Sequence, residues 1–167
     1  VLAEPVDQRS AEFCNEVAEA VAALFARETL SITGGLLRAL RQAHANLTEW
    51  NRRSLREHHV AVGVTCAIIR DDEILIAQAG PGVAYARQGD TIRRLTTEGQ
   101  PAAFPLGRAE PIEPIFTSFS LAEGHVLLLT ENAERALGQR TIEAALAAGP
   151  EQALAQLFPH TRGLADM

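Results

Sequence analysis

The stretch from Ile74 to Thr96, ILIAQAGPGVAYARQGDTIRRLT, decides the fold that this sequence predicts. Two apolar runs of strand length meet at Gly80-Pro81-Gly82, and a second turn at Gln88-Gly89-Asp90 leads into a third run, Thr91 to Leu95. Glycine accepts positive φ and proline presets its own φ, so both residues mark turns. The runs between them are rich in Ile, Leu, Val and Tyr, which suit a half-buried sheet. The stretch therefore predicts an antiparallel meander with a structural hairpin at Gly80-Pro81-Gly82.

Upstream of this meander the sequence has helical periodicity. Apolar residues recur with helical spacing from Ser10, a candidate N-cap, to about Arg27, and again from Leu36 to about Arg56. Trp50 lies on the second apolar stripe and is expected in the core, whereas His44 lies off it and is expected to be exposed. From His59 to Arg70 the pattern alternates, and its second face is small or apolar. Such a pattern is typical of a strand covered on both sides.

The remaining elements follow in blocks. The pair Asp71-Asp72 predicts a hairpin turn into Glu73–Ala79. Beyond the meander we expect strands at Ile115–Leu121 and His125–Thr130, joined by a turn at Ala122-Glu123-Gly124, and then helices at Asn132–Leu137, Thr141–Ala148 and Pro150–Phe158. Two helices, about six strands and two or three helices, without βαβ alternation, indicate an α+β fold with antiparallel strands.

Composition excludes several classes of partner. The 167 residues predict a single domain. A net charge of −6, without a basic stripe interleaved with aromatic residues, argues against nucleic acid. Cys14 and Cys66 lack metal-type spacing and are expected to be small buried hydrophobic residues. Neither a signal peptide nor a long apolar span is present, so we expect a cytoplasmic protein that does not enter the membrane.

The order of motifs resembles that of the metal-dependent serine/threonine protein phosphatases, the type-2C (PPM) family. The pattern of that family is a strand, a Gly-Asp-Ser-Arg turn, an aromatic-bearing strand, a short turn and Leu-Thr, and this sequence matches it at Tyr85, Gly89, Leu95 and Thr96. Other segments resemble the family in the same order. Val1-Leu2-Ala3-Glu4-Pro5 resembles its Val-Ala-Asp-Gly strand end, Leu106-Gly107 resembles its Leu-Gly, and Ser120 to Asn132 resembles its segment ending in Ser-Asp-Gly. Ile142 to Leu157 resembles its closing helices, and Asp166-Met167 resembles its ending. The resemblance implies a four-layer α-β-β-α sandwich with antiparallel sheets. It implies one phosphatase-like domain over residues 1–167, as a fragment lacking its first and last strands.

The same resemblance implies a two-metal centre, in which Asp carboxylates hold two Mg²⁺ or Mn²⁺ ions and a bridging water attacks a phosphoserine or phosphothreonine. Hard cations need several oxygen ligands. The family's ligand positions fall here on Glu4 with Pro5, on Pro81, on Glu131, and on Ala165 beside Asp166. Glu4, Glu131 and Asp166 are thus degenerate metal positions, and Pro5, Pro81 and Ala165 are lost ones. Because at most two carboxylates remain of four, we expect no metal cofactor.

Three functional hypotheses follow. The leading one is a phosphatase-like domain that has lost its two-metal centre and serves as a regulatory or binding module, with a protein or phosphoprotein as its partner. The second is an active Mg²⁺- or Mn²⁺-dependent phosphatase that uses Glu4, Glu131 and Asp166 in an altered site. The third is a structural domain within a larger signalling protein, without a ligand of its own.

Overall fold

The computed structural model describes residues 1–29, 31–96, 104–108, 111–120 and 124–161. Its elements are β1 (Leu2–Pro5), the 3-10 helix η1 (Gln8–Phe13), α1 (Cys14–Phe25), α2 (Ile32–Arg53), the 3-10 helix η2 (Arg56–His58), β2 (Val62–Arg70), β3 (Glu73–Ala79), β4 (Val83–Gln88), β5 (Thr91–Arg94), β6 (Ile115–Ser120), β7 (His125–Leu129), α3 (Glu131–Leu137), α4 (Gln139–Ala148) and α5 (Pro150–Thr161). This order confirms the predicted α+β class. None of the helices in the described ranges is long and apolar enough to cross a membrane.

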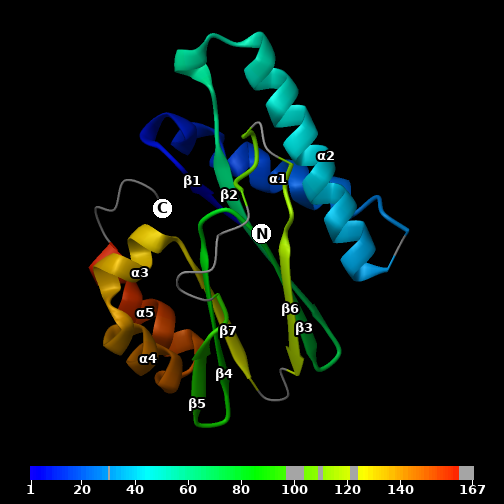
Figure 1. The fold of residues 1–167 in the computed structure, drawn as a ribbon. Helices are drawn as coiled ribbons and strands as arrows, with labels where there is room; N and C mark the ends of the chain where they lie inside the picture. The colour runs from blue at the N-terminus through cyan, green and yellow to red at the C-terminus, as the bar shows by residue number, and fades with distance from the viewer. Residues whose placement is uncertain (30, 97–103, 109–110, 121–123, 162–167) are drawn as a thin grey trace.

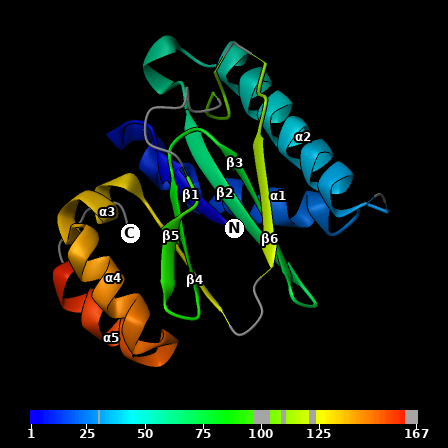
Figure 2. The same ribbon diagram turned by 60° about the horizontal axis from the view of Figure 1, so that its bottom comes forward.

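The strands form two antiparallel sheets. One has the order β1-β2-β3-β6 and the other the order β5-β4-β7. Helices α1 and α2 cover the outer face of the first sheet, and α3, α4 and α5 cover the outer face of the second (Figure 1). The view in Figure 2 shows the two sheets between these helical layers. The four-layer α-β-β-α sandwich is therefore confirmed.

Three apolar clusters hold the layers together. The first joins α1 and α2 to β2 and contains Val21, Leu40 and Val62. The second lies between the sheets and is centred on Ile74, Ile76 and Ala84. The third joins β4 and β7 to the C-terminal helices and contains Val83, Tyr85, Leu129 and Ile142. Because alternate residues of a strand face opposite sides, a strand in an inner layer needs apolar or small residues on both faces. That requirement explains the doubly apolar runs in the sequence.

The predicted hairpin at Gly80-Pro81-Gly82 is wrong. Strand β3 pairs with β2 and β6, whereas β4 pairs with β5 and β7, so the turn between β3 and β4 carries the chain from one sheet to the other. An apolar strand, a Gly-Pro turn and a second apolar strand are equally compatible with a hairpin and with a corner between sheets. The hairpin turns at Asp71-Asp72 and at Gly89 are confirmed, and Asp71 and Gly89 have φ of 54° and 57°.

Ser10 is not the N-cap of one long helix. The helical stretch is divided into η1 and α1, and the side chain of Asp7 accepts a hydrogen bond from the backbone N–H of Ser10. Ser10 itself is buried, and its hydroxyl oxygen accepts a hydrogen bond of 3.0 Å from the backbone N–H of Ala61. Its role is therefore to join η1 to the start of β2.

Two side chains of α2 also differ from expectation. Trp50 is 41% exposed rather than buried, because it lies in the last turn of α2, where its ring packs against Phe13 at a centroid distance of 5.3 Å. His44 is half-buried rather than exposed, and its Nδ1 has no hydrogen-bond partner among the described residues. Cys66 is buried in the first cluster, as predicted, whereas Cys14 is only half-buried against it, and its thiol donates to the carbonyl oxygen of Ser10 at 3.6 Å. Most of the predicted turn at 122–124, and the positions Ala165 and Asp166, lie outside the described residues.

Candidate functional site

The end of β1, the corner between β3 and β4, and the start of α3 surround one hollow of about 570 Å³. The residues that line it are Glu4, Pro5, Val6, Gly80, Pro81, Phe104, Pro105, Arg108, Glu131, Asn132 and Arg135. The structure therefore brings together four of the positions singled out in the sequence, which are Glu4, Pro5, Pro81 and Glu131. The other two, Ala165 and Asp166, lie outside the described residues.

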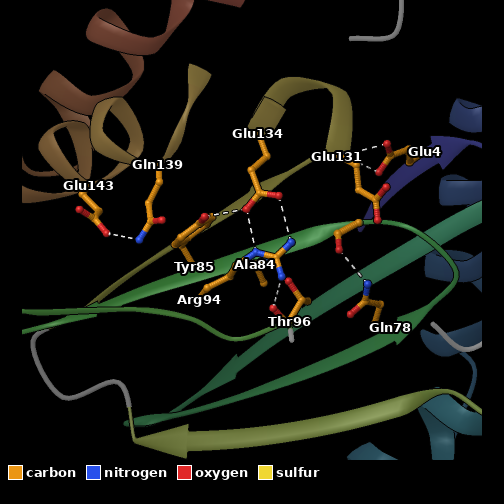
Figure 3. A network of polar contacts seen from close by, with 11 residues as sticks. Glu4, Gln78, Ala84, Tyr85, Arg94, Thr96, Glu131, Glu134, Gln139 and Glu143 are labelled. Atoms are coloured by element: carbon orange, nitrogen blue, oxygen red, sulfur yellow. Dashed lines mark hydrogen bonds and ion pairs between the residues drawn. The ribbon is translucent and has the colours of Figure 1, made fainter. Parts of the chain in front are cut away.

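Glu4 is held by a backbone group of α3. Its side chain is buried, and the residue is 4% exposed. Both carboxylate oxygens accept hydrogen bonds from the backbone N–H of Glu131, at 2.8 and 2.9 Å (Figure 3). Helices leave their first N–H groups without intrahelical partners, and a side-chain oxygen can satisfy them. The Thr130 hydroxyl accepts from the N–H of Ala133 at 3.1 Å in the same way. Glu4 thus joins β1 to the start of α3.

Burial raises the pKa of the Glu4 carboxyl above its ordinary value. The carboxylate of Glu131 acts in the same direction, whereas the backbone N–H groups of Glu131 and Asn132 and the charge of Arg135 oppose the shift. The buried charge is therefore only partly compensated. Carboxyl groups with a shifted pKa are frequent at functional sites, and structural networks of charged groups also shift pKa values.

The corner at residues 80–82 is a packed structural element. The side-chain amide of Gln78 donates to the carbonyl oxygens of Gly80 and Gly82, at 3.1 and 2.7 Å. A methyl group added at Gly63 of β2 would lie 2.7 Å from two ring carbons of Pro81. Gly80 and Gly82 have φ of 79° and 142°, a region that favours glycine. The corner is thus fixed against β2, and the proline side chain supplies no oxygen to the hollow.

A polar network that the sequence did not reveal fixes α3 to the second sheet. The Tyr85 hydroxyl donates to Glu134 at 2.6 Å, and Arg94 donates to both carboxylate oxygens of Glu134, at 2.7 and 3.0 Å (Figure 3). Burial, and then the bond to Glu134, raise the pKa of Tyr85 to about 12. Burial acts to raise the pKa of Glu134, but the hydrogen bonds from Arg94 and Tyr85 and the charges of Arg94 and Arg135 together outweigh burial and lower the pKa of that carboxyl. Tyr85 and Arg94 are register partners on β4 and β5. A correct assignment of the strand pairing could therefore have predicted that these two side chains lie close together.

Comparison with solved structures identifies the architecture. A serine/threonine phosphatase of S. agalactiae matches with a TM-score of 0.81 and 15% sequence identity, over 98% of this chain and 81% of that chain. PppA, described as a key regulatory component of T6SS in Pseudomonas aeruginosa, matches with a TM-score of 0.78 and 16% identity, over 98% and 80%. The Mycobacterium tuberculosis serine/threonine phosphatase PstP/Ppp matches with a TM-score of 0.77 and 13% identity, over 95% and 79%. The chain has the type-2C phosphatase fold. No protein-family model matches the sequence, and no curated protein is significantly similar to it.

The described residues do not fit the two-metal centre that the phosphatase fold implies. Within the described ranges no group of three or more His, Cys, Asp or Glu side chains is placed to hold a metal ion. Glu4 is buried, and both its oxygens accept hydrogen bonds from the backbone N–H of Glu131. Pro81 has no side-chain oxygen, so Glu131 is the one exposed carboxylate among the described residues of the hollow. Mg²⁺ requires near-octahedral oxygen coordination, and two such ions held close together need more carboxylate ligands than the one that Glu131 supplies among the described residues.

Two arginines of the hollow were also missed from the sequence. Arg108 follows the Leu106-Gly107 motif, and Arg135 lies one turn after Glu131 in α3. Both are exposed, and Nη1 of Arg135 donates to the side-chain oxygen of Asn132 at 3.1 Å. Neither arginine belongs to an ion pair within the described part of the chain. A surface arginine has no sequence signature of its own, so only its position in the phosphatase fold reveals it.

Proposed function

We propose that this chain is a type-2C serine/threonine phosphatase-like domain whose two-metal centre has degenerated, and that it acts as a regulatory or binding module for a protein or phosphoprotein. The observation that carries the proposal is the position of Glu4, whose two oxygens accept from the backbone N–H of Glu131 while the residue is 4% exposed. A carboxylate so engaged is a poor ligand for a hydrated cation. Pro81 adds no ligand at the adjacent corner.

The consequence for chemistry is large. In two-metal hydrolysis the ions generate the nucleophile and stabilise the charge that develops on the phosphoryl group. Each 1.36 kcal/mol of lost transition-state stabilisation lowers the rate tenfold, so loss of such a centre removes several orders of magnitude. A hollow that keeps its shape without the ions can still hold a ligand. The similarity to PppA, a regulatory component in its own system, is compatible with such a role.

An active enzyme is the second candidate, because Glu4 and Glu131 do line the same hollow and the solved structures of this fold include serine/threonine phosphatases. In that case Glu4, Glu131 and Asp166 would hold Mg²⁺ or Mn²⁺, and Glu4 would have to release the amide of Glu131.

Hydrolysis of an aryl phosphate and of a phosphoserine peptide, in millimolar Mn²⁺ and in chelator, separates the two candidates. We expect no difference between the two buffers and negligible turnover in both. Turnover near one per second that chelator abolishes would refute the degenerate centre and establish the enzyme.

A further inference from the structure

The hollow has a local charge opposite to that of the whole chain. The chain carries a net charge of −6. Among the described residues that line the hollow, the exposed charged side chains are Arg108, Arg135 and Glu131, two positive against one negative. The fourth charged residue, Glu4, is 4% exposed and both its oxygens accept from an amide. The exposed charges of the described lining therefore favour an anion, in a protein whose net charge is negative.

The two guanidinium groups are available to an anion. Some other arginines of the chain are paired with carboxylates, for example Arg94 with Glu134 at 2.7 Å and Arg53 with Glu49 at 2.7 Å. Arg108 and Arg135 have no such partner among the described residues, and the bond from Arg135 to Asn132 uses one of its five N–H donors. A guanidinium fork matches the oxygens of a phosphate in charge and in geometry, and binds them in pairs.

The rest of the lining suits a peptide around that anion. Phe104 is 51% exposed, and Pro5, Val6, Pro81 and Pro105 add apolar surface beside it. A volume of about 570 Å³ lies within the range of small-ligand sites, and a few apolar groups with convergent polar ones are typical of such sites. An inorganic ion would leave this apolar surface uncovered, whereas residues flanking a phosphorylated side chain would cover it.

We propose that the hollow binds the phosphate group of a phosphorylated peptide directly through Arg108 and Arg135, without a metal ion. The proposal rests on the function proposed above, because it assigns to the arginines the positive charge that two cations would otherwise supply. It also assigns a sign to Glu131. In a metal site the carboxylate of Glu131 would hold a metal ion and so favour binding of the phosphate. In an arginine site the same carboxylate repels the phosphate.

Fluorescence anisotropy with a short labelled phosphoserine peptide, carrying apolar flanking residues, tests the proposal in buffer containing EDTA. The unphosphorylated peptide and free phosphoserine are the reference ligands. We expect the phosphopeptide to bind at least about tenfold more tightly than either, and more weakly as salt is added. Arg108→Gln and Arg135→Gln should each weaken binding by about tenfold or more, the loss expected for a charge-assisted phosphate contact. Glu131→Gln, which keeps the backbone N–H that Glu4 requires, should strengthen it.

Arg140→Gln is the matched control, since Arg140 is an exposed arginine of α4 that does not line the hollow. It removes the same charge and should leave binding unchanged; unchanged melting temperatures show that each variant is folded. Equal binding of the phosphorylated and unphosphorylated peptides, or wild-type binding by both hollow variants, overturns the arginine site. Free phosphoserine binding as tightly as the peptide overturns the peptide assignment. Absence of binding together with absence of hydrolysis overturns this inference alone, whereas Mn²⁺-dependent binding followed by hydrolysis overturns the proposed function as well.

Discussion

Replacing Gly63 by alanine tests whether the corner between the sheets is fixed against β2. The added methyl carbon would lie 2.7 Å from Cγ and Cδ of Pro81, and closer still to its carbonyl oxygen. Ordinary contacts between carbon atoms are about 3.5–4.0 Å, so the corner or the strand must move by about 1 Å. Movement is resisted because Gln78 holds the carbonyl groups of Gly80 and Gly82, and because Gly63 pairs with Glu4 in the β1–β2 register.

Overpacking of this kind costs about 1–3 kcal/mol, and we expect the upper end because two of the opposing groups are a backbone carbonyl and a rigid ring. At about 2–4 °C per kcal/mol for a domain of this size, the melting temperature should fall by roughly 6–12 °C. Urea unfolding should show a lower midpoint with an unchanged m-value. The control is Gly89→Ala, because a methyl group added there would meet no atom within 4 Å among the described residues. Its cost is the backbone strain of an alanine at a φ of 57°, about 1–2 kcal/mol. Melting of the Gly63→Ala variant within 2 °C of the wild type would show that the corner yields freely, and the structural role assigned to it would be wrong.

Three further predictions concern the hollow. Pro81→Asp should lower the free energy of unfolding by only about 1 kcal/mol, because a turn proline stabilises mainly by restricting the unfolded chain; complete unfolding in a circular dichroism melt would contradict this. Millimolar Mg²⁺ or Mn²⁺ should raise the melting temperature by less than about 2 °C, because a ligand stabilises only a fold that binds it, and a larger rise that disappears in Glu131→Ala would show that the site binds metal. The raised pKa of Glu4 means that the folded state binds more protons than the unfolded state between the unfolded and folded pKa values. The stability of the wild type relative to Glu4→Gln should therefore increase as the pH falls from 7 through the folded pKa, and urea titrations that show the opposite trend would sink this assignment.

The strands and helices were predictable because each has a strong local signal. Period-two apolar runs between Gly, Pro and Asp turns marked β2 to β7, and the spacing of Leu36, Leu40 and Ala43 marked α2. The distribution of the strands between two sheets was not predictable in this way. Strand β3 ends and β4 begins at the same Gly-Pro-Gly turn in either arrangement, and only long-range pairing with β6 and β7 separates them.

The site was predictable only in its outline. The resemblance placed Glu4, Pro81 and Glu131 at equivalent positions, and the fold does bring them to one hollow. It could not show what Glu4 contacts, because the hydrogen bond joins residues 127 positions apart. Arg108 and Arg135 were missed for a related reason. Their significance depends on how charged side chains are arranged around the hollow, and a sequence does not show which charges lie together in space.

The contact made by Glu4 also explains why a glutamate suits this position in the present structure. An aspartate is shorter by one methylene, a difference of about 1.5 Å along the side chain. Both oxygens of Glu4 lie within 2.9 Å of the Glu131 nitrogen, so the shorter side chain would leave that N–H without its acceptor unless β1 and α3 approached each other. A buried amide without a partner costs about 1–3 kcal/mol, and the part-buried N–H of Glu131 should lie at the lower end of that range. The longer carboxylate thus joins β1 to the start of α3 in a way that a shorter aspartate could not at the same backbone position, and its two hydrogen bonds leave Glu131, Arg108 and Arg135 as the exposed charged groups of the described lining.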